Sequence, residues 1–468
     1  MRPAVLRAVA PVAVALVLAV LPAPDGLSRA AWWFFALFAG TVTALVLEPV
    51  PAAAAGVVSV SLAAALRLVD PSPAASARWA LSGFGNATVW LIFSAFVLAL
   101  GYEKSGLGRR LALLMVKAIG RRPLGLGYAV ALSDLVLAPL TPSNTARSAG
   151  TLFPVIRQIP EQGAPGSPEA QRRLGGYLAW TAFASTCITS SMFLTALAPN
   201  LLAVEVVRTT TGVRLEWTSW LLGFWPVGLA LAAATPLASY AFFRPVAGAS
   251  EAGAAGWAAS QLREMGAVTR REGKVALLAL LALAGWVAGR ELLDATTVAL
   301  LVVGLMVLTG AVRWEDVLGH AAAWNVLVWF ATLVALADGL ARVGFVPWIA
   351  KSATAPLAAL SPTAAALLLL ALFFASHYLF ASVTAHVAAL LPVALATAAA
   401  LPGIDAARFA AVLCYSLGLM GVISPYATGP APVYYASGFL SRGQFWGLGF
   451  AFGSVFLLAL LALAAVTL

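Results

Sequence analysis

Residues 136–155 read VLAPLTPSNTARSAGTLFPV, and this stretch predicts the fold of the chain. Its polar centre, residues 141–147, lies between two apolar arms that carry Pro139 and Pro154. This arrangement is typical of a segment that enters a membrane and returns. Non-helical backbone at membrane depth is tolerated only where protein or a water-filled cavity satisfies it. Residues 124–156 are therefore predicted to form a re-entrant hairpin that faces a binding site.

Residues 362–398 show the same arrangement around Ser382-Val383-Thr384 and predict a second re-entrant hairpin. An offset of 239 positions relates Ser143-Asn144-Thr145 to this triplet, and the same offset relates Asn86-x-x-x-Trp90 to Asn325-x-x-x-Trp329. Five predicted membrane crossings separate Asn86 from Asn325, so the second copy is expected upside down. Inverted repeats of this kind place substrate and ion sites at the midplane of the membrane.

The composition requires a lipid environment. Hydrophobic residues make up 62% of the 468 positions, charged residues only 10%, and the mean hydropathy is +0.94. A soluble domain carries about 25% charged residues, so lipid must cover most of this surface. Because a spanning helix needs about 20 mostly apolar residues, we predict an all-α polytopic membrane protein with about eleven transmembrane helices. The expected spans are 8–23, 31–48, 52–68, 86–102, 174–204, 219–243, 275–290, 294–311, 324–341, 404–438 and 443–467.

The net charge of +10 follows membrane topology and does not indicate a nucleic-acid partner. With the N-terminus in the cytoplasm, eighteen Lys and Arg residues fall in cytoplasmic segments and nine in outer segments, which is the expected bias. No basic stripe interleaved with aromatic residues is present, as a phosphate backbone would require. We therefore expect an inner-membrane protein whose partners are the bilayer and small anions.

These patterns divide the chain into four parts. Residues 1–30 form a first transmembrane helix, although the first 24 residues also resemble a signal peptide. Residues 31–243 form the first inverted repeat, and 244–273 form a cytoplasmic linker rich in Gly and Ala. Residues 274–468 form the second inverted repeat.

The first hairpin tip offers hydroxyl and amide groups suited to an anion and a cation. Ser143, Asn144 and Thr145 supply donors for a carboxylate and oxygens for a sodium ion. The alternative is a turn that caps a helix. Arg147 is the one cation expected within the membrane, where a charge suggests function. It either compensates the charge of a substrate carboxylate or extends to the lipid headgroups.

Two long apolar stretches are predicted to break at proline. Ala198-Pro199-Asn200 marks the first break, and Ala427-Thr428-Gly429-Pro430-Ala431-Pro432 marks the second. Proline removes a donor and glycine permits close approach of the backbone, so an unwound segment exposes N–H and C=O groups to a ligand. The alternative is a simple proline kink.

His377 and His386 flank the second tip, and either one can compensate a substrate charge if it is protonated. The alternative is that both are hydrogen-bonded structural residues. Asp134 and Asp338 are further intramembrane candidates.

The sequence gives no indication of an enzyme. HExxH, a Walker A lysine and GxGxxG after a strand are all absent from it, and three histidines make a metal centre improbable. Cys187 and Cys414 lie in apolar runs without a CxxC partner and are expected to be free buried thiols.

Taken together, residues 142–147, Ser382-Val383-Thr384 with His386, and residues 426–430 resemble the divalent anion:sodium symporter family, in particular its dicarboxylate exchangers. The resemblance covers nearly the whole chain. It implies a homodimer, a scaffold domain, and a transport domain that moves like an elevator. It also implies a dicarboxylate at the two tips and at 427–430, with Ser143, Asn144 and Ala196 as the candidate sodium site. Apart from sodium, no cofactor is expected.

The sequence departs from the family pattern at three places. Val383 stands where a symporter has Asn, and a hydrocarbon cannot coordinate a cation. Gly429 and Ala431 replace a Pro and an Asn of the second break, and residues 197–200 read Leu-Ala-Pro-Asn in place of Thr-Pro-Pro-Asn. We therefore predict a sodium-independent dicarboxylate exchanger. The alternatives are sodium-coupled symport of a dicarboxylate or citrate, an anion channel and, more remotely, an intramembrane enzyme.

Overall fold

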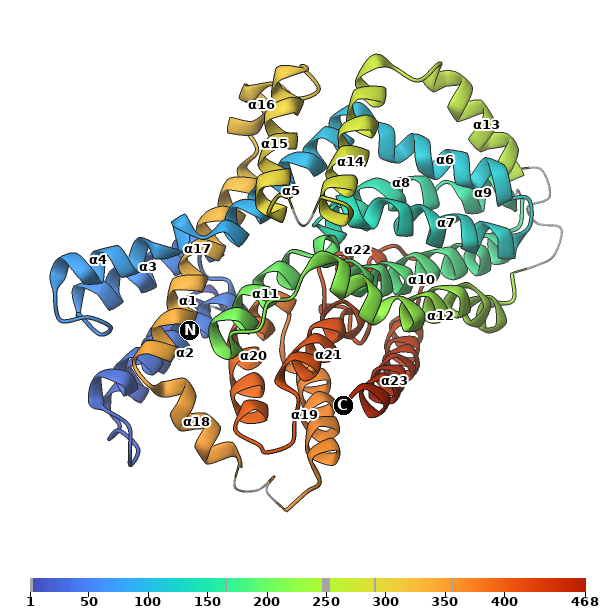
Figure 1. The fold of residues 1–468 in the computed structure, drawn as a ribbon. Coiled ribbons are helices and arrows are strands. Elements are labelled where there is room, and N and C mark those ends of the chain that lie inside the picture. Colours follow the sequence, from blue (N-terminus) through green and yellow to red (C-terminus); the bar gives the residue numbers. More distant parts are fainter. Residues whose placement is uncertain (1–2, 165, 246–252, 290–291, 355–356, 358) are drawn as a thin grey trace.

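The computed structural model describes residues 3–164, 166–245, 253–289, 292–354, 357 and 359–468, and these residues form helices and loops without strands (Figure 1). Within these described residues, seven helices are long and apolar enough to cross a membrane by length and composition, and five shorter apolar helices accompany them. The fold is therefore all-helical with several apolar helices, as predicted. The number of spans, eleven, stays a prediction.

The first part of the chain runs through six helices, which are α1 (Pro3–Val20), α2 (Arg29–Leu47), α3 (Ala52–Ala65), α4 (Pro73–Leu81), α5 (Ala87–Ser105) and α6 (Leu107–Ile119), with the short turn η1 (Ser82–Gly85) before α5. Helix α1 packs closely on α2. The indole of Trp32 donates to Leu18 O at 2.8 Å, and a Cβ on Gly40 would lie 2.8 Å from Pro11 O.

The first predicted hairpin, 124–156, is formed by α7 (Pro123–Leu137), the turn η2 (Ala138–Leu140), the π-helix η3 (Thr145–Leu152) and α8 (Phe153–Ile156), with α9 (Ile159–Gly163) following. Proline starts α7 because the first turn of a helix does not use that N–H. Residues 141–143 between η2 and η3 are not helical, and Asn144 is the N-cap of η3, so the polar triplet lies at the tip.

The centre of the fold is α10 (Pro168–Met192), which is followed by η4 (Leu194–Ala196), α11 (Ala198–Thr211) and α12 (Trp217–Phe243). Every residue of α10 from Leu174 to Met192 is buried, and the helix packs against α7, α12 and α21. The first break lies at 193–197, upstream of the predicted 198–200. Pro199 is at the start of α11, where its missing N–H costs nothing.

The linker carries a helix, α13 (Gly253–Met265), and is followed by α14 (Arg270–Val287), α15 (Ala295–Leu308), α16 (Trp314–Leu318), α17 (Ala321–Arg342) and α18 (Phe345–Thr354). Helix α17 packs against α3 and α5. A second hydrophobic core, separate from the main one, is formed by α2, α3, α4, α17 and α18. Figure 1 shows this group at one side of the molecule.

The last part contains α19 (Pro362–Ser376), η5 (His377–Leu379), α20 (Val383–Ala399), α21 (Ala406–Leu419), η6 (Met420–Val422), α22 (Ala431–Tyr435) and α23 (Arg442–Thr467). Helices α19 and α20 are the arms of the second predicted hairpin, 362–398. Residues 423–430 between η6 and α22 are non-helical, so the second break begins four residues before the predicted 427. Helices α19, α20, α21 and α23 gather on one side of α10 and α12 (Figure 1).

The repeat matches at the tips but not at the asparagines. Ser143 accepts a hydrogen bond from Ala146 N at 3.2 Å, and Ser382 accepts one from Ala385 N at 3.4 Å. Asn86 caps α5, whereas Asn325 lies inside α17, which begins at Ala321. The Asn86–Asn325 pair is therefore not a structural equivalence, and the inverted repeat stays a prediction that the tips support.

Candidate functional site

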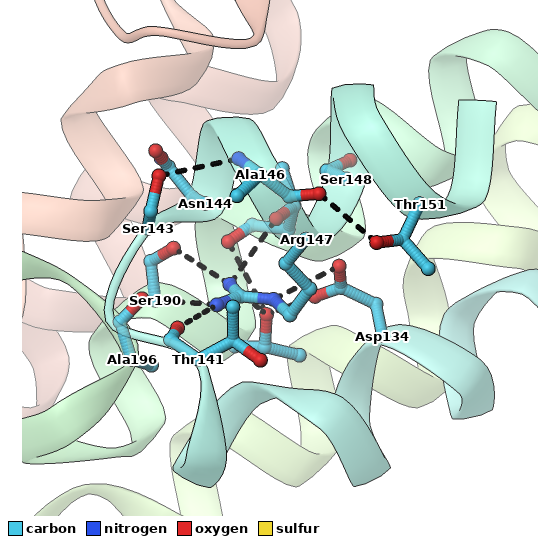
Figure 2. A network of polar contacts seen from close by, with 12 residues as sticks. Asp134, Thr141, Ser143, Asn144, Ala146, Arg147, Ser148, Thr151, Ser190 and Ala196 are labelled. Atoms are coloured by element: carbon cyan, nitrogen blue, oxygen red, sulfur yellow. Dashed lines mark hydrogen bonds and ion pairs between the residues drawn. The ribbon is translucent and has the colours of Figure 1, made fainter. Parts of the chain in front are cut away.

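The first tip continues directly into a π-helix. Thr151 Oγ1 donates to Ala146 O at 3.1 Å, five residues earlier, and Ser143 Oγ accepts from Ala146 N (Figure 2). π-helical turns are rare and occur mostly at functional sites. Thr145 is exposed, while Arg147, two residues further along and on the opposite side of the turn, is buried.

Arg147 is the centre of a polar network beneath this tip (Figure 2). Its Nε lies 3.1 Å from Asp134 Oδ1, and its Nη1 donates to Thr141 O at 2.8 Å and to Ala196 O at 3.0 Å. The Nη2 group contacts three hydroxyl oxygens of α10 within 3.3 Å, which belong to Thr186, Thr189 and Ser190. All five guanidinium donors therefore have an acceptor.

The position of Arg147 corrects both predictions made for it. Its side chain is 0% exposed, so it does not extend to the lipid headgroups. No donor is left for a substrate carboxylate, and Asp134 offsets the positive charge. Asp134 in turn accepts a hydrogen bond from the Thr189 hydroxyl. Arg147 therefore acts as a positioning residue that fixes the tip to α7 and α10.

The first tip is also bonded to the first helix break through the backbone. Ala198 N donates to Pro142 O at 2.8 Å, and Thr195 Oγ1 donates to Pro139 O at 2.5 Å. Together with the bond from Arg147 to Ala196 O, these contacts hold residues 193–197 against the hairpin. The predicted sodium ligand Ala196 thus lies beside the tip, as a sodium site would require, but its carbonyl already accepts from a guanidinium.

The second break contacts both hairpins. Asn144 Nδ2 donates to Thr428 Oγ1 at 2.8 Å, and His377 Nε2 donates to Ala427 O at 2.8 Å. Gly429 faces Thr145 so closely that a Cβ on this glycine would lie 1.9 Å from Thr145 Oγ1. The predicted site residues of the first tip and of 427–430 are therefore one cluster, with Pro430 completing the non-helical segment.

The second tip is more apolar than the first. Val383 is buried and begins α20, while Ser382, the N-cap of this helix, and Thr384 are half-buried. His386 Nε2 lies 3.0 Å from Ser376 Oγ, and its ring is packed between Phe373 and Phe380. The His377 and His386 rings are 5.0 Å apart. His377 touches the second break, whereas His386 lies between the arms of its own hairpin.

Sequence reasoning missed the contribution of α10. Thr186, Thr189 and Ser190 share the face that meets Arg147, because residues three and four apart lie on one side of a helix. The signal that could have found them is the run of Thr and Ser at 181–191 within an apolar stretch. Buried hydroxyl groups at helical spacing need a partner, and Arg147 is the one cation that the sequence analysis places within the membrane.

An apolar all-helical chain in which a polar hairpin tip meets two helix breaks defines a multi-pass membrane transporter. The chain belongs to the family described as sodium:sulfate symporter transmembrane region, which matches residues 3–467. This confirms the resemblance seen in the sequence and shows that the protein is not an enzyme.

Two curated relatives are antiporters of Escherichia coli (strain K12). The citrate/succinate antiporter is 43% identical over 469 residues, covering 97% of this chain and 96% of the relative. The L-tartrate/succinate antiporter is 41% identical over 468 residues, with the same coverage. The chain is therefore similar along nearly its whole length to antiporters of citrate, L-tartrate and succinate.

Two solved structures share the fold at low sequence identity. The YdaH transporter of Alcanivorax borkumensis has a TM-score of 0.52 at 18% identity, covering 83% of this chain and 86% of that one. MtrF of Neisseria gonorrhoeae has a TM-score of 0.55 at 14% identity, covering 100% of this chain and 95% of that one.

Proposed function

We propose that this chain exchanges C4 and C5 dicarboxylates of the malate, succinate and 2-oxoglutarate class across the inner membrane without sodium. The two relatives are named as antiporters, and succinate occurs in both names. The site cluster of Asn144, Thr145 and 427–430 supplies the amide, hydroxyl and free backbone groups that suit a carboxylate.

The observation that carries sodium independence is the 3.0 Å hydrogen bond from Arg147 Nη1 to Ala196 O. This carbonyl is one of the three predicted ligands of the first sodium site. A carbonyl that already accepts from a guanidinium offers less to a second cation, which the positive charge also repels. At the second tip Val383 provides no oxygen from its side chain.

Compensation of the two substrate charges falls to other groups, because Asp134 offsets Arg147. Helix N-termini carry partial positive charge, and discontinuous helices in transporters direct these ends at anions. Helix α11 begins at Ala198, beside the first tip, and α20 begins at Val383 in the second. His377 and His386 are the remaining titratable groups of the cluster, and Ser143, Ser382 and Thr384 complete the proposed substrate contacts.

The proposed movement is an elevator in a homodimer, with the N-terminus and the linker 244–273 in the cytoplasm. The separation of the second core from the main hydrophobic core supports two bodies. In this scheme α2, α3, α4 and α17 belong to the scaffold, and the two hairpins, α10 and α21 belong to the transport domain. Residues 246–252 of the linker lie outside the described residues.

Sodium-coupled symport is the second candidate, because the family description names sodium and the first tip retains Asn144. Uptake of labelled succinate into proteoliposomes separates the two. Exchange predicts that vesicles preloaded with succinate take up label several-fold faster than empty vesicles, with or without sodium. Rapid filling of empty vesicles on adding external sodium, without stimulation by preloading, would establish symport instead.

A further inference from the structure

A cavity of about 690 Å³ lies between α6, the π-helix η3 and α13. Ala146, Gly150 and Pro154 line one wall, at the spacing of one helix face. Arg147 leaves the same π-helix in another direction, toward Asp134. The cavity therefore runs along the face of the hairpin arm that the structural network does not use.

This cavity begins next to the substrate cluster. Ala146, on its wall, follows the exposed Thr145 and donates its N–H to Ser143 Oγ. A Cβ built on Gly150 would meet nothing closer than Thr145 O at 3.8 Å. The wall is thus open at Gly150, and its other end, at Ala146, adjoins the tip.

Two consecutive arginines of α6 have opposite surroundings. Arg110 is buried, and its donors bond Glu272 and the backbone oxygens of Met265, Gly266 and Ala267. Arg109 is exposed and lines the cavity, and its one hydrogen bond among the described residues runs from Nη2 to Gln261 Oε1 at 2.6 Å. Most of the Arg109 donors are therefore available to an anion in the cavity.

Helix α13 closes the far side of the cavity. It supplies Trp257 to the lining and Gln261 to Arg109. Gly253 approaches α9 so closely that a Cβ would lie 2.0 Å from Gln162 O, and Ala258 is fully buried. The linker helix is thus held against α6 and α9, as Figure 1 shows, and forms a fixed wall.

A second cavity, of about 530 Å³, lies between α5, α11, α12 and α15 and differs in charge. It is lined by three acids and two arginines, which are Glu205, Glu216, Asp294, Arg208 and Arg214. Glu205 already pairs with Arg208 at 2.6 Å. The cavity beside η3 has one arginine and one acid, Glu103, and is the better route for a dianion.

We propose that the cavity between α6, η3 and α13 is a vestibule where a dicarboxylate dianion binds transiently on its way to the first tip, with Arg109 as the recruiting residue. The planar guanidinium suits a carboxylate. Glu103 leaves the vestibule without net formal charge, so the dianion binds weakly and moves on. This inference deepens the proposed function and rests on it.

Cysteine accessibility tests the location. Cys187 and Cys414 are 0% exposed, so Gly150→Cys adds the accessible thiol, and the space at Gly150 tolerates it. A charged thiol reagent applied from the side that exposes α13 is expected to block exchange, and succinate in excess is expected to slow the labelling. Gly256→Cys, placed in open space on α13, is the control and should label without loss of exchange.

Labelling at Gly256→Cys with no labelling at Gly150→Cys would overturn the vestibule, and so would labelling at Gly150→Cys that leaves exchange intact. Both outcomes require exchange by the unlabelled protein. If the unmodified protein shows no exchange, the result contradicts the proposed function itself and not the vestibule alone.

Arg109→Gln tests recruitment. Loss of a group that binds only on the way to the site should raise KM several-fold with little change in kcat. The increase should shrink at high salt, because screening weakens the attraction in the unsubstituted protein. Arg263→Gln, on the exposed surface of α13 outside the cavity, should leave KM unchanged. An unchanged KM for Arg109→Gln at low salt would overturn the role of Arg109.

Discussion

The side-chain amide of Asn144 donates a hydrogen bond of 2.8 Å to the hydroxyl of Thr428, across 284 positions of sequence. The bond joins the tip of the first hairpin to the second helix break. Because His377 bonds Ala427 next to it, this short segment connects both hairpins. The proposed site thus depends on residues from both halves of the chain.

Asn144→Ala is expected to abolish succinate exchange without unfolding the protein, because one hydrogen bond contributes only about 0.5–1.5 kcal/mol to stability. Thr428→Val should have a similar effect. The double variant Asn144→Ala with Thr428→Val should be only slightly less stable than the less stable of the two single variants. Thr209→Val, which removes a hydroxyl bonded only within α11, is the matched control. Normal exchange by Asn144→Ala would remove these residues from the site.

Asp134→Asn should destabilise the protein by about 3–5 kcal/mol, because it leaves the guanidinium of Arg147 buried without its ion-pair partner. Denaturant unfolding in detergent measures the effect. The double change Asp134→Leu with Arg147→Met should cost less than the single one, since it removes both charges. Glu169→Gln breaks exposed ion pairs with Arg172 and Arg173 and should change stability little. If Asp134→Asn and Glu169→Gln lowered the free energy of unfolding equally, the buried ion pair would be contradicted.

Gly429→Ala should impair both folding yield and exchange, because the added Cβ would lie 1.9 Å from Thr145 Oγ1. Combining it with Thr145→Ala removes that atom and should recover part of the thermal stability. Gly304→Ala in α15, where the Cβ meets nothing, serves as control and should be neutral or slightly stabilising. The close approach would be disproved by full stability of Gly429→Ala alone.

The stabilisation that the ion pair between α5 and α16 contributes should depend on pH. Lys104 lies 2.8 Å from Asp316 and, with Arg313, lowers the pKa of this carboxyl from 3.8 to about 2. A lowered pKa stabilises the fold above the unfolded value, and that contribution is lost as pH falls through the folded value. The melting temperature of Asp316→Asn should thus lie below that of the unsubstituted protein at neutral pH. If the difference in melting temperature between the two proteins were as large at pH 2 as at neutral pH, the ion pair of Asp316 would not be its cause.

The bounds of the helices on either side of each tip could be predicted from the sequence, because proline, apolar arms and a polar centre act locally, whereas the re-entrant path stays a prediction. Residues 124–156 and 362–398 match α7–α8 and α19–α20 to within a residue or two. The partner of Arg147 could not be read in this way. The sequence predicts Asp134 to be an intramembrane acid, but its pairing with Arg147 depends on tertiary contacts, namely the tip folding back and hydroxyl groups from α10.

The π-helix and the positions of the two helix breaks could not be predicted from the sequence either. A π-helix has no composition of its own, so residues 145–152 read as an ordinary arm. Pro199 predicts a break because proline stops a helix, yet proline also starts helices, and here Pro199 lies in the first turn of α11. The offset alone relates Asn325 to Asn86, and an offset does not show that α17 begins four residues before Asn325 whereas Asn86 caps α5.

The bonds around the first tip also limit where the molecule can bend. Arg147 links α7, the tip and α10, and Ala198 N reaches Pro142 O across the break. A hinge placed within these segments would have to rupture several buried hydrogen bonds at once. Any motion that carries the site across the membrane must therefore take residues 134–147 and 186–198 along as one rigid block, and the flexing has to occur in the connections beyond them.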